Sequence, residues 1–258
     1  MVSRTGIEPV TCRLGGGRSI LLSYRDIARL ALSPSGLEAN TSLTLVPQAV
    51  SGKLSIMDLE PLKLKIARLS CERDYRLLFD SLAFTLDAGS ILRVAGKNGA
   101  GKTTLLRTIA GLYEIQEGEV LVGDQPVCEA MNRILYIGHR PQVTGDLSVL
   151  DNVKYMAGHD DTSLKFALDS VGMLGFHDSL VKELSQGQGR RCALARLWCS
   201  DAPIWILDEP YTALDVSMIK ILDDKIRSHV ANGGICLFTT HQVPTLSEFQ
   251  TLELGCVD

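Results

Sequence analysis

Eight consecutive residues fill every fixed position of the phosphate-binding pattern G-x-x-x-x-G-K-[ST]. They are Gly96, Lys97, Asn98, Gly99, Ala100, Gly101, Lys102 and Thr103. The glycines allow a tight turn, and their backbone N–H groups form a nest for phosphate oxygens. Lys102 is placed to reach the β- and γ-phosphates of a nucleotide, and Thr103 to give a hydroxyl ligand to Mg²⁺. We predict that ATP and Mg²⁺ bind at this loop, with Thr104 as a further contact.

The residues on both sides of the loop have the character of elements that would hold it. Residues 91–95 form a short apolar run suited to a buried strand, and residues 105–110 continue as a helix. A helix that starts near Lys102 adds the positive end of its dipole to the phosphate nest. A glycine-rich turn that matched the pattern by chance would lack this strand and this helix.

A pair of carboxylates follows a second apolar run. Residues 204–207 have the composition of a buried parallel strand, which delivers Asp208 and Glu209 to its C-terminal end. Open α/β sheets bind ligands at this edge. We expect Asp208 to bind Mg²⁺ through water and Glu209 to act as the general base that polarises the attacking water. Two adjacent carboxylates could also be a solvated strand end, so the pair needs support from other motifs.

A histidine ends a further apolar run in the same way. Residues 235–238 are apolar, and His241 follows them after two threonines. An imidazole can donate or accept a proton near neutral pH, which suits a contact with phosphate. A lone histidine at a strand end is more often structural, and its spacing from Asp208 favours the functional interpretation.

Residues 184–188, with the sequence LSQGQ, resemble the signature motif of ABC-type ATPases and lead into an amphipathic helical stretch. The resemblance implies that Ser185, Gly187 and Gln188 contact the γ-phosphate of a nucleotide held by another copy of the chain. Residues 211–215 resemble the loop that passes between two such sites. The working unit implied is a head-to-tail dimer of nucleotide domains. The resemblance also implies that His241 is the switch histidine, and it supports Glu209 as a catalytic residue.

Residues flanking these motifs resemble one group within the ABC family, the ATP-binding subunits of the cytochrome c maturation transporter (CcmA). The resemblance is carried by residues 70–74, 78–79, 137–141, 193–198 and 239–242. It implies a subunit held by integral membrane partners at the cytoplasmic face of the bacterial inner membrane. ATP hydrolysis would power haem export or the release of a haem-loaded chaperone. An ABC transporter ATPase for another substrate and a soluble ABC assembly ATPase are the alternatives.

Two positions depart from the common ABC pattern. Counting back from residues 147–153 places His139 where most ABC ATPases have glutamine, and Gln142 could substitute only if the loop were rearranged. The expected place of the adenine-stacking aromatic falls on Arg73. Arg73 could stack through its planar guanidinium, or Tyr75 could take over.

Composition limits the possible partners. A net charge of −4 gives no indication of nucleic acid binding, and no apolar stretch approaches the ~18 residues needed to cross a bilayer. Membrane attachment is therefore expected through partners. The seven cysteines lack a C-x-x-C pair, which suggests reduced thiols. Because His159 and His177 lie in polar, turn-like sequence, we expect no direct haem binding.

The chain divides into two regions of different character. Residues 1–56 carry six basic and three acidic residues and are interrupted by glycine, serine and proline turns. We expect this segment to be disordered or a spurious extension, translated from a transfer-RNA gene, with Met57 as the true start. Residues 57–258 are expected to form an α/β ABC-type P-loop NTPase domain. It would have a mainly parallel sheet, an antiparallel β subdomain, and an inserted helical subdomain at about 139–200 that docks the membrane partner.

Overall fold

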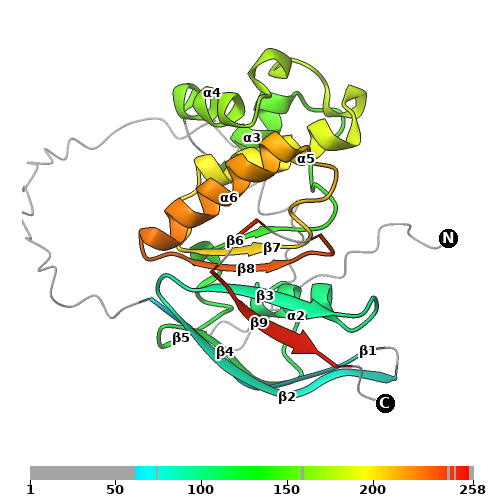
Figure 1. Ribbon diagram of the computed structural model, residues 1–258, viewed down its shortest axis with the longest axis vertical. Coiled ribbons are helices and arrows are strands. Elements are labelled where there is room, and N and C mark those ends of the chain that lie inside the picture. The colour runs from blue at the N-terminus through cyan, green and yellow to red at the C-terminus, as the bar shows by residue number, and fades with distance from the viewer. Residues whose placement is uncertain (1–61, 74, 158–159, 243–244, 247, 256–258) are drawn as a thin grey trace, which may run out of the picture. The chain divides into compact units, whose positions relative to one another are not determined.

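The computed structural model describes residues 62–73, 75–157, 160–242, 245–246 and 248–255 (Figure 1). They belong to a compact unit that begins at position 61. The expectations about residues 1–56, Met57 and His159 lie outside the described residues. Within the described part, none of the helices combines the length and apolar character that crossing a bilayer requires.

One sheet is antiparallel, with its strands in the order β2-β1-β4-β5. Its members are β1 (Lys63–Arg73), β2 (Arg76–Asp87), β4 (Glu117–Val122) and β5 (Gln125–Pro126). Alternate side chains point into the core, so Leu64 pairs with Val122 and Ile66 with Val120, all four buried. Gly118 lets β4 approach β1, because a Cβ there would lie 2.2 Å from the carbonyl oxygen of Arg68.

The second sheet is parallel throughout, in the order β6-β7-β8-β3-β9. Its strands are β3 (Ile91–Gly96), β6 (Ile134–Ile137), β7 (Ile204–Leu207), β8 (Ile235–Thr239) and β9 (Gln250–Leu254). Every residue of β7 and β8 is buried, as expected for strands covered on both faces. These two sheets confirm the predicted α/β fold.

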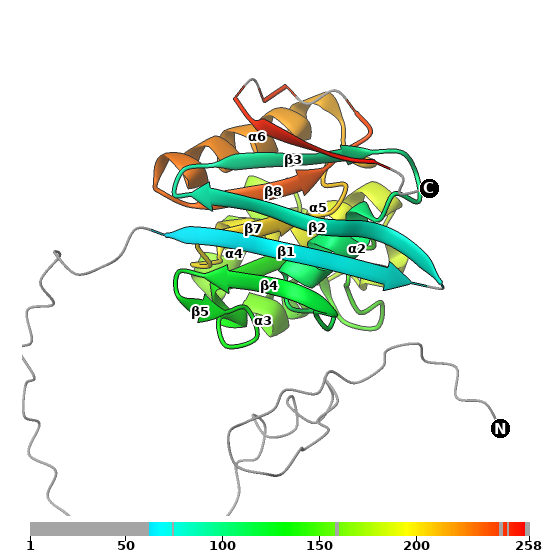
Figure 2. The ribbon, with the colours of Figure 1, turned by 90° about the horizontal axis from the view of Figure 1, so that it is seen from below.

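Helices lie on both sides of the parallel sheet. Helix α2 (Lys102–Ile109) packs between the two sheets, where its Leu105 and Leu106 share a core with Leu64 and Ile206 (Figure 2). On the opposite face, α6 (Val216–Ala231) packs Leu222 and Ile226 against β7 and β8. The parallel sheet is therefore a central layer whose strand ends are held from both faces.

The remaining helices gather at the end of the domain away from the antiparallel sheet (Figure 1). They are α3 (Val149–Ala157), α4 (Asp161–Ser170), α5 (Gln186–Leu194) and three short 3-10 turns, η2 (Leu174–Phe176), η3 (Val181–Glu183) and η4 (Ala195–Trp198). A further 3-10 turn, η1 (Met131–Arg133), lies between β5 and β6, next to the antiparallel sheet. The members of this group between 149 and 199 have a core of their own, which includes Val153, Leu164 and Cys192. The stretch after the signature is not one continuous α-helix, because α5 ends at Leu194 and tightens into η4, a common way for helices to end.

Candidate active site

A cavity of about 740 Å³ opens at the C-terminal ends of the parallel strands. The predicted site residues that line it are Asn98, Gly99, Gly101, Lys102, Thr103, Thr104, Asp208, Glu209 and His241. Arg73, Arg76 and Leu78 of the antiparallel sheet, with His139, Thr212 and Gln242, complete the lining. The structure thus brings together the phosphate-binding loop, the two carboxylates and the histidine, although they are up to 145 positions apart in sequence.

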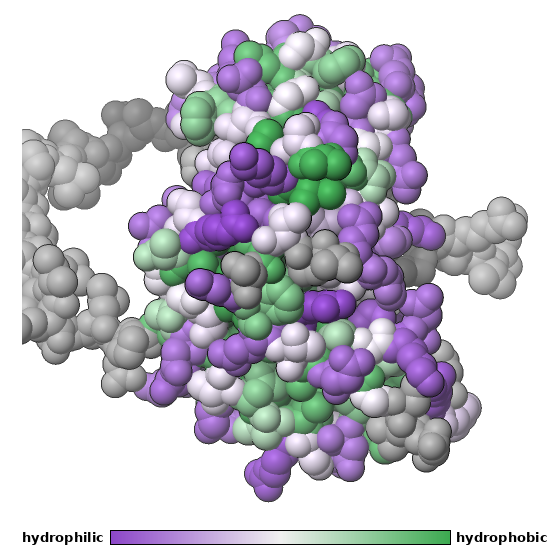
Figure 3. All heavy atoms as spheres, viewed as in Figure 1, coloured by the Kyte–Doolittle hydropathy of each residue, from purple (hydrophilic) through white to green (hydrophobic). Residues whose placement is uncertain are grey.

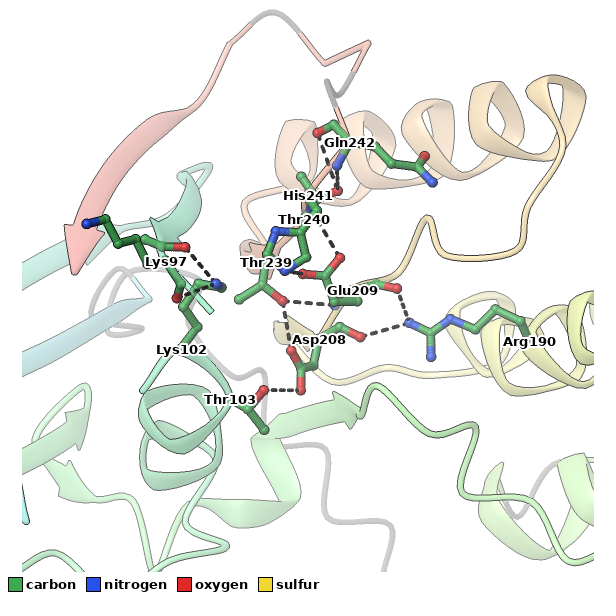
Figure 4. Close-up of polar contacts among 11 residues, drawn as sticks. Lys97, Lys102, Thr103, Arg190, Asp208, Glu209, Thr239, Thr240, His241 and Gln242 are labelled. Carbon is green, nitrogen blue, oxygen red and sulfur yellow. Dashed lines mark hydrogen bonds and ion pairs between the residues drawn. The ribbon is translucent and has the colours of Figure 1, made fainter. Parts of the chain in front are cut away.

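The loop between β3 and α2 has the geometry of a phosphate nest. Gly96 has φ +141° and a Cβ there would lie 2.7 Å from the carbonyl oxygen of Leu254, so only glycine fits without a shift. Gly101 is left-handed with φ +92° and no side chain caps the start of α2, which leaves backbone N–H groups for a ligand. The ammonium group of Lys102 donates to the carbonyl oxygens of Gly96 at 2.7 Å and Lys97 at 3.1 Å (Figure 4).

Oxygen ligands suited to a hard cation meet beside this loop. The Thr103 hydroxyl donates to Oδ2 of Asp208 at 2.9 Å, and the Thr239 hydroxyl donates to Oδ1 at 2.8 Å. Asp208 is only 1 % exposed. A hydroxyl and a carboxylate fit Mg²⁺, which commonly takes one or two protein ligands together with substrate phosphates. Thr239, which sequence reasoning did not single out, fixes the orientation of this carboxylate.

Glu209 is held in an unusual conformation next to the cavity. Its φ of +52° lies in the left-handed region, and its backbone N–H donates to the Thr239 hydroxyl at 2.9 Å. Oε2 accepts from the backbone N–H of His241 at 3.2 Å. Oε1 is buried and has no hydrogen-bond partner among the described residues, and Nε2 of His241 lies 3.4 Å from it, within ion-pair distance when the imidazole is protonated. Because Glu209 lines the cavity, its carboxylate is suited to accept a proton from a water bound there.

The signature residues lie on another surface, outside the cavity lining. Ser185 caps α5 in a reciprocal box: its hydroxyl accepts from the N–H of Gln188 at 3.3 Å, and the Gln188 side chain accepts from the N–H of Ser185 at 2.9 Å. Gly187 packs so closely that a Cβ there would lie 2.8 Å from the carbonyl oxygen of Ala213. The signature and the 211–215 loop are therefore in direct contact.

The structure separates the alternatives that the sequence left open. His139 lines the cavity and Gln142 is not among its lining residues. Arg73 also lines it, and its guanidinium lies 5.4 Å from the ring centroid of Tyr113 and donates to that hydroxyl at 3.2 Å. Tyr75 is fully exposed and lines a different hollow. This geometry favours His139 and Arg73 as the neighbours of a nucleotide, and both assignments stay predictions.

Sequence reasoning missed Arg190, the most extensively bonded side chain near the site. It is 2 % exposed, and its guanidinium donates to the carbonyl oxygen of Gly138 at 2.6 Å. It also donates to the carbonyl oxygens of Asp208 at 2.9 Å and Glu209 at 2.6 Å (Figure 4). Burial lowers the pKa of Arg190 to about 10, against the opposing effect of the two nearby carboxylates, so it stays charged at neutral pH. Nothing in the sequence distinguishes it from its neighbour Arg191.

A second missed group is a fully buried carboxylate on α6. Asp223 accepts from the Tyr211 hydroxyl at 2.7 Å and, through its other oxygen, from the Thr245 hydroxyl. Burial and this hydrogen bond raise the pKa of Tyr211 well above its usual range. Asp223 therefore ties the segment after Glu209 to the segment after His241.

Known proteins resemble this chain along most of the described domain. The ABC transporter family model matches residues 63–212. The cytochrome c biogenesis ATP-binding export protein CcmA of Saccharophagus degradans is 42% identical over 202 residues, which cover 72% of this chain and 91% of that protein. The protein of the same name from Escherichia coli K12 is 44% identical over 190 residues, covering 72% and 92%.

Two solved structures share the fold of this chain. A putative ABC transporter ATP-binding protein from Pyrococcus furiosus has a TM-score of 0.66 and 29% identity, covering 74% of this chain and 97% of that one. A bacterial Atm1-family ABC exporter with ATP bound has a TM-score of 0.67 at 21% identity over 76% of this chain and 37% of that one, which supports the fold alone. The chain is therefore an ATP-binding ATPase subunit that belongs to the ABC transporter family and, within it, to the CcmA group.

Proposed function

We propose that this chain hydrolyses ATP to drive a step of c-type cytochrome biogenesis as the ATPase subunit of a membrane transporter complex. The observation that carries the hydrolytic part is the convergence of Lys102, Asp208 and Glu209 on one cavity. The biological role rests on the identity to proteins named for cytochrome c biogenesis. Haem export and release of a haem-loaded chaperone are the two forms that this step could take.

The hydrolytic step follows from the positions of the polar groups. Lys102 and the N–H groups at the start of α2 neutralise charge on the β- and γ-phosphates. Glu209 takes a proton from a water as its oxygen attacks the γ-phosphorus, and the bond to the bridging oxygen breaks to give ADP and phosphate. Thr103 and Asp208 would hold Mg²⁺, which supplies further charge neutralisation when bound. His241, beside Glu209, would contact the γ-phosphate.

A second copy of the chain would complete each site. Ser185, Gly187 and Gln188 lie outside the cavity of their own chain, and the capped start of α5 offers N–H groups to the γ-phosphate of a nucleotide in the partner copy. The neighbouring start of α6 exposes apolar surface, since Val216 is 83 % exposed. Figure 3 shows hydrophobic atoms on the surface in the region of this helix. Such surface suits a contact between copies in a head-to-tail dimer.

Membrane subunits would dock on the helical region. Tyr155 of α3 and Phe166 of α4 are more than half exposed, and Phe176 of η2 is 40 % exposed. Exposed aromatic side chains of this kind are enriched in protein interfaces. This docking would place the chain peripherally at the cytoplasmic face of the bacterial inner membrane.

The test is complementation of a bacterial strain that lacks its own CcmA-group subunit, with haem-stained c-type cytochromes as the readout. We expect this chain to restore them and Lys102→Ala to fail, while integral subunits co-purify with both. A chain that hydrolyses ATP but restores no c-type cytochrome would contradict the biological role and favour a transporter for another substrate. Recovery from the cell with soluble scaffold proteins alone would favour an assembly ATPase.

A further inference from the structure

One guanidinium joins three segments of the active site. Arg190 lies on α5, and beyond the three bonds given above it donates to the carbonyl oxygens of His139 and Pro210, each at 3.4 Å. All five acceptors are backbone carbonyls at or just beyond the C-terminal ends of β6 and β7. Backbone groups at these positions lie where the ladder of the sheet stops, so they need other partners when buried.

Only arginine matches this set of acceptors. Its planar fork carries five N–H donors in fixed directions, so Nη1 serves the end of β6 while Nη2 serves the end of β7. A lysine side chain ends in a single nitrogen, which cannot donate to both strand ends with the geometry of the guanidinium. The shorter side chain of glutamine would leave buried carbonyl oxygens without a donor.

Hydrogen bonds hold the backbone of Glu209 at both its N–H and its carbonyl group. Its N–H is held by Thr239 at 2.9 Å, and its carbonyl oxygen by Arg190 at 2.6 Å. Because its φ of +52° is sparsely populated for a residue with a side chain, this conformation needs such contacts to persist. A displacement of Arg190 would therefore reach the backbone of the general base directly.

Arg190 and the signature belong to one helical element, because Ser185 caps the same nine-residue helix. We propose that Arg190 is a positioning residue that couples the Ser185 end of α5, which contacts the nucleotide of the partner copy, to Glu209 and His139 in its own site. The inference rests on the proposed function, since it needs Ser185 to act on the second copy's nucleotide. Such a coupling would make hydrolysis in one site depend on the contact of Ser185 with the nucleotide of the second copy.

The adjacent arginine provides a matched control. Arg191 points toward Asp215, a carboxylate that is more than half exposed, and makes no bond to the strand ends among those described. The Arg191 side chain is only one-quarter exposed, so the loss of this ion pair can have an effect of its own. Arg191→Gln removes the same charge from the next position of the same helix without touching Glu209, and it therefore measures the effect of charge loss on α5 alone.

The experiment measures ATPase kcat, ATP affinity and thermal denaturation in the complex assembled with its membrane subunits. We expect Arg190→Gln to lower kcat by at least ~10-fold with ATP affinity within about threefold of wild type. Arg190→Lys should recover part of kcat, and Arg190→Gln should lower kcat several-fold more than Arg191→Gln does. Equal kcat in wild type and Arg190→Gln would overturn the inference. If Arg190→Gln does not fold, a folded Arg190→Lys with unchanged kcat would overturn it.

A double-mutant cycle with Ser185→Ala separates coupling from a structural role. If Arg190 transmits what Ser185 contacts, the double variant should lose little more kcat than the more damaged single variant. Losses that multiply would show that the two residues act independently and would refute the coupling. A wild-type complex that does not hydrolyse ATP would instead refute the proposed function, and the inference with it.

Discussion

Replacing Thr239 by valine should both destabilise the domain and impair hydrolysis, because one hydroxyl serves both carboxylate residues. Thr239 is fully buried, donates to Asp208 at 2.8 Å and accepts from the N–H of Glu209 at 2.9 Å. Valine has nearly the same shape and can make neither bond. The bond to a charged carboxylate contributes about 1.5–3 kcal/mol, and a buried N–H left unpaired costs about 1–3 kcal/mol. The added methyl recovers about 1 kcal/mol.

The net loss is about 1.5–5 kcal/mol in the free energy of unfolding. In a domain of this size each kcal/mol shifts Tm by about 2–4 °C, so Tm should fall by roughly 3–20 °C. Because the N–H of Glu209 would lose its acceptor, kcat should fall by about tenfold or more, measured as phosphate release at saturating ATP. Thr239→Ser keeps the hydroxyl and should retain most of kcat. A Thr239→Val protein with unchanged Tm and kcat would refute the reasoning.

Two further predictions concern phosphate binding and acid stability. Lys102→Ala should raise the Kd for ATP by at least ~10-fold, measured by titration with a fluorescent analogue, because it removes a cation from the triphosphate site; an unchanged Kd would exclude Lys102 from phosphate binding. His229 stacks on Trp205 with centroids 3.7 Å apart, and burial lowers its pKa from 6.5 to about 4. The unfolded chain therefore binds more protons between these values, so stability is fully present above pH 6.5 and is lost as pH falls toward 4. Allowing for the partial exposure of His229, this change in the free energy of unfolding amounts to about 1–2 kcal/mol. The free energy of unfolding of His229→Phe, measured by denaturation across this pH range, should lack this decrease. A pH profile identical to that of the wild type would contradict the prediction.

The sequence was sufficient to predict what depends on local pattern. Each residue of the phosphate-binding loop follows from a contiguous motif, and the apolar runs before Asp208 and His241 identified the strands that carry them. Because parallel strands end at one edge of a sheet, the sequence alone predicts that Asp208 and His241 lie near one cavity. The edge strand β9 was not anticipated, since most of its side chains are exposed and its sequence lacks a buried run.

Contacts that depend on three-dimensional packing could not be predicted. Arg190 and Arg191 are adjacent, and only the packing of α5 against β6 and β7 decides which one turns inward. The bonds from Tyr211 and Thr245 to Asp223 join three separate segments without any motif. The choice of His139 over Gln142 depends likewise on the path of a loop, where Gln142 takes a left-handed φ of +46°.

The most direct test of the central claim is turnover by Glu209→Gln, measured beside wild type in the complex with its membrane subunits. Glutamine keeps the size of the side chain and can still accept from the N–H of His241, so the fold and the ATP affinity should be retained. We predict that kcat falls by at least ~10², the scale of general-base loss, while ATP stays bound. Wild-type turnover in Glu209→Gln would contradict the assignment of the base, and failure of the wild-type complex to bind or hydrolyse ATP would contradict the whole account.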